Sequence, residues 1–102
     1  MKLKDRVAII TGGGTGIGRA ISFAFAREGA MVAVAARNLP RLEETVKAIK
    51  AKGGRAIAIQ TDITDHEQIK KMVARTIDEF KQIDILVNNA ARAPSTTPKW
   101  PI

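Results

Sequence analysis

The sequence predicts an α/β fold with a doubly wound parallel sheet. Short apolar runs rich in β-branched residues alternate with longer segments whose apolar residues recur at helical spacing, in the order βαβαβαβ. Each stretch between two apolar runs is long enough for a crossover helix, which indicates parallel strands. Glycines separate the first strand from the first helix and follow the first two helices.

The first strand and the first helix flank a glycine turn. Residues 6–11 form a short apolar run ending in glycines, which is typical of a strand buried on both faces. Residues 17–28 form a predicted helix that Gly29 closes. The expected apolar stripe of this helix consists of Ile17, Ala20, Ile21, Phe23, Ala24 and Phe25.

The second strand and helix repeat this pattern. Residues 31–36 are continuously apolar, and residues 40–52 form a predicted helix that stops at two glycines. We expect that helix to place Leu42, Val46 and Ile49 on its buried face.

The third helix follows a strand at residues 55–60 and precedes a fourth strand at residues 83–87. Thr64 and Glu67 have the spacing of a capping box, which predicts the start of this helix. The residues expected to point inward are Ile69, Met72, Val73, Ile77 and Phe80.

We expect the strand order 3-2-1-4 with right-handed crossovers. In that order the first two helices cover one face of the sheet and the third covers the other. The chain changes sides after strand one, which creates a ligand crevice at the carboxyl ends of the strands.

Length and composition limit the chain to one domain of the globular class. The sequence has 102 residues, 45% of them hydrophobic, and no cysteine, which excludes a disulfide framework and a thiolate metal site. We assign residues 1–91 to the domain and residues 92–102 to an irregular tail, because Pro94, Pro98 and Pro101 interrupt regular structure. The apolar run at residues 7–10, which follows the basic start of the chain, is too short for a signal peptide or a membrane span, so we expect a cytoplasmic location.

The formal net charge of +7 has two interpretations. An excess of Lys and Arg can mark a nucleic-acid surface or solvated helix faces. The basic residues are dispersed, and the whole aromatic content is one Trp and three Phe, so few rings are present to stack on bases. We therefore favour solvated helix faces and expect no nucleic-acid partner and no membrane partner.

Residues 11–18, Thr-Gly-Gly-Gly-Thr-Gly-Ile-Gly, are the candidate phosphate-binding loop. Gly12, Gly16 and Gly18 follow the spacing G-x-x-x-G-x-G, which differs from the strict G-x-G-x-x-G fingerprint. Glycines at these positions let backbone N–H groups approach a pyrophosphate at the positive end of a helix, and Thr11 and Thr15 add hydroxyl groups. The alternative is an ordinary tight turn between a strand and a helix.

Ala36 and Arg37 stand at the end of the second strand, where a site for NAD would carry an acid. A guanidinium at this position attracts a 2′-phosphate and can bind its oxygens in a bidentate manner. The sequence therefore favours NADP over NAD. The alternative is that Arg37 is a solvated turn residue.

Thr11 to Gly18, Asp62 and the run Asn88-Asn89-Ala90-Ala91 together resemble the motifs of the classical short-chain dehydrogenases/reductases. The resemblance covers residues 4–91. It implies a Rossmann-type NAD(P)-binding half and, in an intact relative, hydride transfer between NADP(H) and a carbonyl, an alcohol or a related substrate. It also implies that intact members are usually homo-oligomers.

The resemblance assigns cofactor-binding roles position by position. It places Gly12, Gly13, Gly14, Thr15, Gly16, Ile17 and Gly18 at the phosphates, Arg37 and Asn38 at the 2′-phosphate, Asp62 and Ile63 at the adenine, and Asn89, Ala90 and Ala91 near the ribose. Asn88 resembles the asparagine that stabilises the sheet in this family. Ala91 departs from the usual glycine, and Asp62 has the alternative role of a turn or capping residue.

The chain contains no tyrosine, and the family's catalysis resembles general acid catalysis by a tyrosine with a nearby lysine and serine. Ser22 lies in a predicted helix, Ser95 lies in the tail, and neither has a credible catalytic partner. We expect His66 to be a surface residue rather than a ligand. We therefore expect no catalytic residue and no metal site in this chain, which should be inactive alone.

Residues 95–102 differ from a typical family continuation. A one-base shift of reading frame converts codons for Phe-Asn-Asp-Pro-Glu-Val-Ala-Asn into Ser-Thr-Thr-Pro-Lys-Trp-Pro-Ile, so we expect a frameshift near codon 95. With strand four at an exposed edge, the chain alone should be poorly soluble or molten and should bind NADP weakly. The alternatives are a stand-alone nucleotide-binding or regulatory module and, third, a basic nucleic-acid binder.

Overall fold

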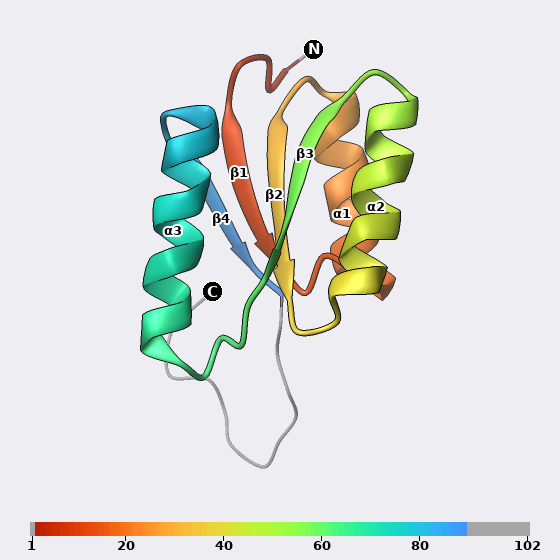
Figure 1. The fold of residues 1–102 in the computed structure, drawn as a ribbon. Helices are drawn as coiled ribbons and strands as arrows, with labels where there is room; N and C mark the ends of the chain where they lie inside the picture. The colour runs from red at the N-terminus through yellow and green to blue at the C-terminus, as the bar shows by residue number, and fades with distance from the viewer. Residues whose placement is uncertain (1, 90–102) are drawn as a thin grey trace.

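The computed structural model describes residues 2–89 (Figure 1). Four parallel strands form one sheet in the order β3-β2-β1-β4, so the predicted strand order and the doubly wound, Rossmann-type α/β class are confirmed. The tail expected at residues 92–102, its frameshift, and Ala90 and Ala91 lie outside the described residues. The elements in chain order are β1 (Val7–Thr11), α1 (Gly16–Arg27), β2 (Met31–Ala36), α2 (Leu39–Ala51), β3 (Arg55–Gln60), α3 (His66–Phe80) and β4 (Ile85–Asn88).

The strand β1 lies in the centre of the sheet and pairs in parallel with both β2 and β4. Ile9 is opposite Ala33 on one side and Leu86 on the other, and all five residues of β1 are buried. A strand with neighbours on both edges and helices on both faces contacts no water, which explains why its sequence is continuously apolar.

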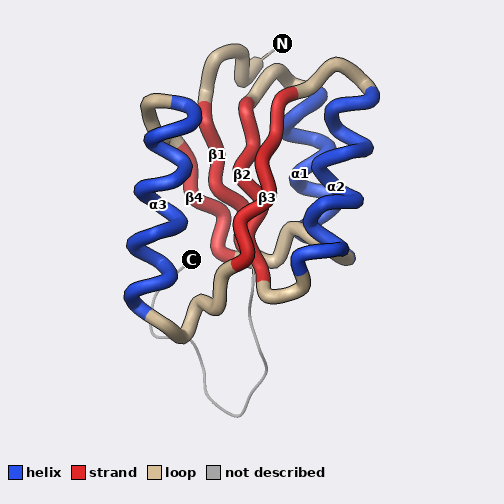
Figure 2. The backbone as a smooth tube through the Cα atoms, in the orientation of Figure 1, coloured by secondary structure: helices blue, strands red, loops and turns tan. Residues whose placement is uncertain are grey.

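Two hydrophobic clusters cover the two faces of the sheet. Because side chains alternate along a strand, Ile10, Val32 and Val34 point toward α1 and α2, whereas Ile9 and Ala33 point toward α3. Figures 1 and 2 show α1 and α2 together on one side of the sheet and α3 on the other. The predicted change of side after β1 is therefore confirmed.

Three apolar residues expected on the buried faces of helices are exposed, namely Ile17, Ala20 and Ile77. Ile17 is 71% exposed because it lies in the first turn of α1, beyond the carboxyl ends of the strands. Ile77 is 47% exposed, while Met72, Thr76 and Phe80 form the buried face of α3 at four-residue intervals. Thr76 takes the core position because its hydroxyl donates to the Met72 carbonyl at 2.8 Å, which satisfies its polar group inside the helix.

The predicted capping box at Thr64 and Glu67 is wrong. The N-cap of α3 is Asp65, whose Oδ1 accepts from the backbone N–H groups of Glu67 at 2.9 Å and Gln68 at 3.4 Å. The hydroxyl of Thr64 instead donates to Asp62 Oδ1 at 2.6 Å. Asp and Thr both cap helices well, so sequence spacing alone did not distinguish them.

The strand β4 begins at Ile85, two residues later than expected, because Asp84 makes contacts at the start of β1. The backbone N–H of Asp84 donates to the Val7 carbonyl at 2.9 Å, and the Asp84 carboxylate accepts from the Val7 N–H at 2.8 Å. This residue therefore ties the loop before β4 to the first residue of the central strand.

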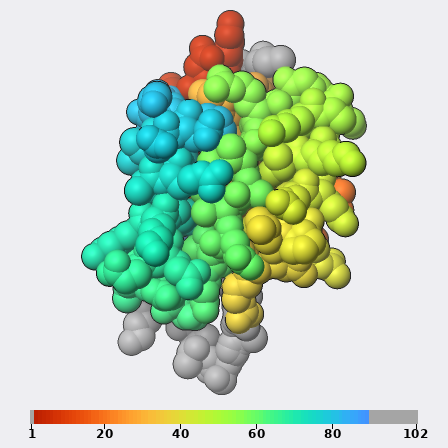
Figure 3. Space-filling model, viewed as in Figure 1, coloured from red at the N-terminus to blue at the C-terminus, as the bar shows by residue number. Residues whose placement is uncertain are grey.

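Figure 3 shows the face of the molecule on which β3 lies between α3 and α2. The strand β3 is an edge strand, and Arg55 and Gln60 at its two ends are exposed. Within residues 2–89 no helix has the length and apolar character that crossing a membrane requires.

Candidate functional site

The loops that follow β1, β2 and β3 meet the end of β4 at the carboxyl edge of the sheet. Figure 2 shows the connections from β1 to α1, from β2 to α2 and from β3 to α3 at the same end of the molecule. Parallel strands place their carboxyl ends together, so the glycine loop, Arg37, Asp62 and Asn89 reach this edge from four separate parts of the sequence.

The glycine loop turns sharply after β1. Gly12 has φ +71° and Gly16 has φ +55°, in the left-handed region that favours glycine. The Gly12 N–H donates to the Ala35 carbonyl at 2.7 Å, which fixes the start of the loop against β2. A Cβ on Gly18 would lie 2.0 Å from the Gly12 oxygen, so the first turn of α1 packs directly on this loop.

The middle of the glycine loop is supported by β2 and α2. A Cβ on Gly13 would lie 2.8 Å from Val34 Cβ, and the Gly13 carbonyl accepts a hydrogen bond from the buried Thr45 hydroxyl at 3.2 Å. A Cβ on Gly14 would lie 3.2 Å from Arg41 Cβ. The sequence analysis did not identify Thr45 as a residue that supports the loop. A polar residue on the apolar face of a predicted helix could have indicated this role, because a buried hydroxyl needs a hydrogen-bond partner.

The outer part of the loop is open. Thr15, Gly16 and Ile17 are exposed, and a Cβ on Gly16 would have no atom within 4 Å. Thr15 is the N-cap of α1 but makes no side-chain capping bond, and the first turn contains no acidic residue. An exposed helix N-terminus without a side-chain cap and without a carboxylate suits an anion.

The end of β2 presents one guanidinium and one capping amide. Arg37 is exposed, and its carbonyl accepts from Gln60 Nε2 at 3.0 Å, which ties this turn to β3. Asn38 Oδ1 accepts from the Arg41 N–H at 3.2 Å and so serves as the N-cap of α2. The structure thus shows a capping role for Asn38, whereas the sequence suggested only a ligand role.

The loop after β3 is organised by Asp62. Its Oδ1 accepts from the backbone N–H of Thr64 at 3.0 Å, and its own N–H donates to Gln68 Oε1 at 2.7 Å. The turn role considered for Asp62 is therefore confirmed. Ile63 beside it is half-buried, and His66 is exposed at the start of α3, as expected.

Thr11 and Asn89 join the glycine loop to the end of β4. The Thr11 hydroxyl accepts from the Asn89 N–H at 2.9 Å and lies 3.2 Å from Asn88 Oδ1 and 3.3 Å from the Val87 carbonyl. A Cβ on Gly18 would also lie 2.8 Å from Asn89 Nδ2. The buried Thr11 hydroxyl is therefore a structural link between β1 and β4, whereas the sequence suggested a donor to a ligand.

The side chains of Asn38, Asp62 and Thr11 at this edge accept hydrogen bonds from backbone N–H groups. No group of three or more His, Cys, Asp or Glu side chains that could hold a metal ion occurs within residues 2–89. Ser22 is buried in α1, where its hydroxyl donates to the Gly18 carbonyl at 2.8 Å. This hydrogen bond satisfies the buried hydroxyl within its own helix, and Ser22 is not exposed to solvent.

Known proteins resemble this chain over most of its length. A protein from Pseudocercospora fijiensis named short chain dehydrogenase MYCFIDRAFT_6125 is 48% identical over 92 residues, which cover 90% of this chain and 30% of that protein. The Bacillus subtilis short-chain dehydrogenase/reductase homolog YusS is 42% identical over 92 residues, which cover 89% of this chain and 84% of that protein.

Solved structures share the same arrangement of strands and helices. A hydroxysteroid dehydrogenase from Escherichia coli superposes with a TM-score of 0.88 at 36% identity, covering 98% of this chain and 43% of that chain. The apo form of a glucose dehydrogenase from Caenorhabditis elegans gives 0.85 at 40% identity and covers 91% of this chain and 40% of that chain. The chain thus spans less than half the length of these two dehydrogenases.

The family model described as short chain dehydrogenase matches residues 6–99, which include the glycine loop, Arg37, Asp62 and the two asparagines at the end of β4, Asn88 and Asn89. These are the segments that the sheet brings to one edge. The chain therefore belongs to the short-chain dehydrogenase family.

Proposed function

We propose that the chain is the cofactor-binding part of an NADP-preferring short-chain oxidoreductase. Its family uses NAD(P) cofactors, and the whole enzyme would transfer hydride between NADP(H) and a carbonyl, alcohol or related substrate. The observation that carries this proposal is the open N-terminus of α1 beside a glycine loop whose Gly18 leaves no room for a side chain.

The residues proposed to hold the cofactor have different tasks. Backbone N–H groups of residues 12–18 would face the pyrophosphate, because the loop is glycine-rich and the helix dipole favours negative charge there. Asp62 and Ile63 would border the adenine. Asn89, with Ala90 and Ala91, would line the pocket near the ribose.

Arg37 supports the preference for NADP. It is exposed at the carboxyl end of β2, and its neighbours Ala36 and Asn38 carry no charge that would repel a 2′-phosphate. Asn38 lies beside it but uses its side-chain oxygen as a cap, so only its amide nitrogen would be available to a phosphate.

The proposed preference is tested by measuring the dissociation constants of NADPH and NADH for the chain and for Arg37→Ala by titration calorimetry. Loss of a charge-assisted contact should weaken NADPH by about tenfold and leave NADH within about twofold. Arg75→Ala, which removes an exposed arginine from α3, is the matched control. Equal weakening of both cofactors by Arg37→Ala, or no weakening of NADPH, would refute the assignment of Arg37.

A stand-alone nucleotide-binding or regulatory module is the second candidate. The observation that favours it is the similarity to YusS, of which this chain covers 84%. Because the chain has no tyrosine, we propose that it has no dehydrogenase activity alone under either function. Tight NADPH binding by a monodisperse chain without turnover of alcohol or carbonyl substrates would support the module.

A further inference from the structure

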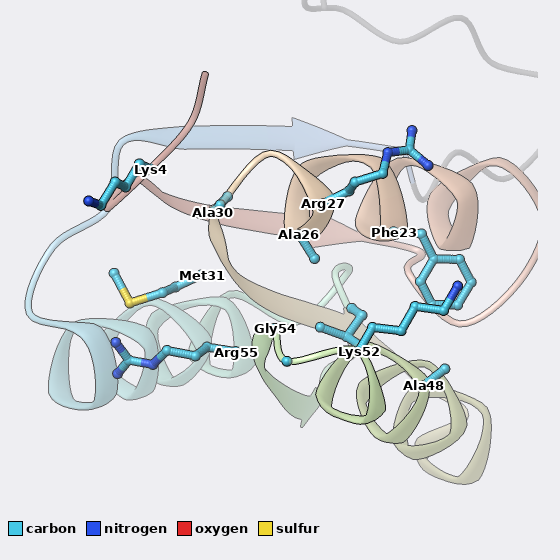
Figure 4. A pocket seen from close by; sticks show the side chains of 13 residues that line it. Lys4, Phe23, Ala26, Arg27, Ala30, Met31, Ala48, Lys52, Gly54 and Arg55 are labelled. Carbon is cyan, nitrogen blue, oxygen red and sulfur yellow. The ribbon is translucent and has the colours of Figure 1, made fainter. Parts of the chain in front are cut away.

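A cavity lies at the opposite end of the sheet from the glycine loop. It has a volume of about 590 Å³ and lies between the C-terminal ends of α1 and α2 and the starts of β2 and β3 (Figure 4). Met31 and Arg55, the first residues of those strands, are part of its wall. The cavity is therefore separate from the carboxyl edge that carries the candidate functional site.

The floor of this cavity is apolar and consists largely of small residues. Ala30 and Ile49 belong to the hydrophobic cluster beneath α1 and α2, and Phe23 and Ala26 pack against it. Gly54 cannot be replaced by a larger residue without a clash, since its Cβ would lie 2.6 Å from Ile49 Cγ2. Small side chains in these positions leave a hollow that the protein itself does not fill.

The rim of the cavity is positively charged. Lys4, Arg27, Lys52 and Arg55 line it, all four are exposed, and no carboxylate is among its lining residues. Within residues 2–89 none of the four forms an ion pair. Arg55 stacks its guanidinium over the Phe80 ring at 5.6 Å.

Two acidic residues are adjacent in the sequence to residues of this rim, Asp5 after Lys4 and Glu28 after Arg27, and neither forms an ion pair with the rim within residues 2–89. The Glu28 carboxylate accepts a hydrogen bond from the Lys2 backbone N–H at 3.1 Å. Lys4, Arg27 and Lys52 therefore remain available to an external anion. Their aliphatic stems can extend along the apolar floor while their charged ends meet the ligand head group.

We propose that this cavity binds a free aliphatic carboxylate of medium chain length. The volume lies within the range of about 300–1,000 Å³ that is usual for small-molecule sites, which are mostly apolar with a few polar groups that orient the ligand. The alkyl chain contacts the floor formed by Phe23, Ala26 and Ile49. The carboxylate contacts the cationic rim, so the charge and the shape of the cavity select the same class of ligand.

The proposal is tested on the unmodified chain by calorimetric titration with hexanoate, octanoate and decanoate below their micellar concentrations. Each added methylene should strengthen binding about fourfold, because it removes further apolar surface from water. Decanol, which lacks the charge, should bind about tenfold more weakly than decanoate. Equal affinity for decanol, no dependence on chain length, or binding only to anionic phospholipid vesicles would overturn the proposal.

Variants locate the binding site. Lys4→Glu with Lys52→Glu should weaken decanoate about tenfold and leave decanol unchanged. Lys47→Glu with Lys71→Glu changes the net charge equally outside the cavity and should leave both affinities unchanged. Ala48→Phe should fill the cavity and weaken both ligands, with folding checked by circular dichroism. Decanoate affinity that is unaffected by Ala48→Phe, or reduced equally by both charge variants, would overturn the assignment.

Discussion

Gly18 is the residue at which the glycine loop and α1 approach each other most closely. Its missing Cβ would lie 2.0 Å from the Gly12 carbonyl oxygen and 2.8 Å from Asn89 Nδ2. A side chain can move aside, but the Gly12 oxygen belongs to a backbone that β2 already holds through the Gly12 N–H. Any larger residue must therefore move the helix away from the loop.

We predict that Gly18→Ala lowers the free energy of unfolding by about 1–3 kcal/mol, the usual cost of overpacking. Gly14→Ala is the matched control, since its Cβ would lie 3.2 Å from Arg41 Cβ and requires only a small adjustment. Urea unfolding followed by circular dichroism measures both variants. Equal destabilisation by the two substitutions would contradict the proposed clash with the Gly12 oxygen.

Asp84 couples stability to pH through its contacts at the start of β1. The hydrogen bond from the Val7 N–H lowers the pKa of Asp84, and the hydrogen bond from Gln82 lowers it further. Desolvation opposes this decrease, and the charge of Arg6 adds to it. A pKa that is lower in the folded state means that the ionised carboxylate stabilises the fold above the unfolded pKa of 3.8. This stabilisation is lost as the pH falls through the folded pKa.

We therefore predict that the urea midpoint falls as the pH decreases from about 5 toward 2, and that Asp84→Asn makes this decrease smaller. At pH 7 the same variant should be less stable than the unmodified chain, because a neutral amide accepts the Val7 N–H more weakly. Asp78→Asn, an exposed change on α3, is the control. An unchanged pH dependence in Asp84→Asn would exclude this coupling.

At the scale of elements, α3 depends on one capping side chain. It is the only helix packed against the face of the sheet that carries Ile9 and Ala33 within the described residues. Its N-cap, Asp65, also lies next to the Asp62 turn of the candidate functional site. Loss of the cap should therefore affect both the helix and that loop.

We predict that Asp65→Ala lowers the free energy of unfolding by about 0.5–2 kcal/mol, because two N–H groups of the first turn lose their acceptor. Thr64→Ala should cost less, since Thr64 contacts Asp62 and not the helix. The comparison uses urea midpoints and amide hydrogen exchange in the first turn of α3. A larger effect of Thr64→Ala would restore the capping box that the sequence suggested.

At the scale of the whole molecule, β4 is an edge of the sheet within the described residues. Leu86 on this strand is 62% exposed, although its neighbour in register, Ile9, is buried. An exposed parallel edge with an apolar side chain favours association with other chains. Poor solubility and a broad thermal transition of the chain alone stay predictions.

We predict that the chain self-associates through β4 and that Leu86→Lys reduces this association, because a charge on an edge strand opposes pairing. Sedimentation velocity over a range of protein concentrations measures the mean mass. Ile77→Lys, which places the same charge on the exposed side of α3, should have little effect. A chain that is monomeric at all concentrations would refute this prediction. A sharp, cooperative thermal transition would refute the separate expectation that the chain alone is molten.

Local sequence determined the order and type of the seven helices and strands within residues 2–89. Continuous apolar runs such as residues 31–36 specify strands, and glycines at 12, 29 and 53 specify where strands and helices end, because these signals act over a few residues. The lengths of the connections then predicted parallel strands, and the preference for right-handed crossovers limited the possible strand orders. Because parallel strands place their carboxyl ends together, the glycine loop and Arg37 lie at the same edge of the sheet.

Only the tertiary structure decided which side chains serve the fold and which face a ligand. Helical spacing allowed either Thr76 or Ile77 to be buried, and contact with the sheet selected Thr76. Asn38, Asp62 and Thr11 were suggested as contacts for a cofactor, and their partners come from α2, the β3–α3 loop and β4. The cationic cavity likewise joins residues from three segments of the sequence, at residues 4, 23–31 and 48–55. Such contacts depend on how distant parts of the chain pack together, and patterns within a few residues of sequence do not predict that packing.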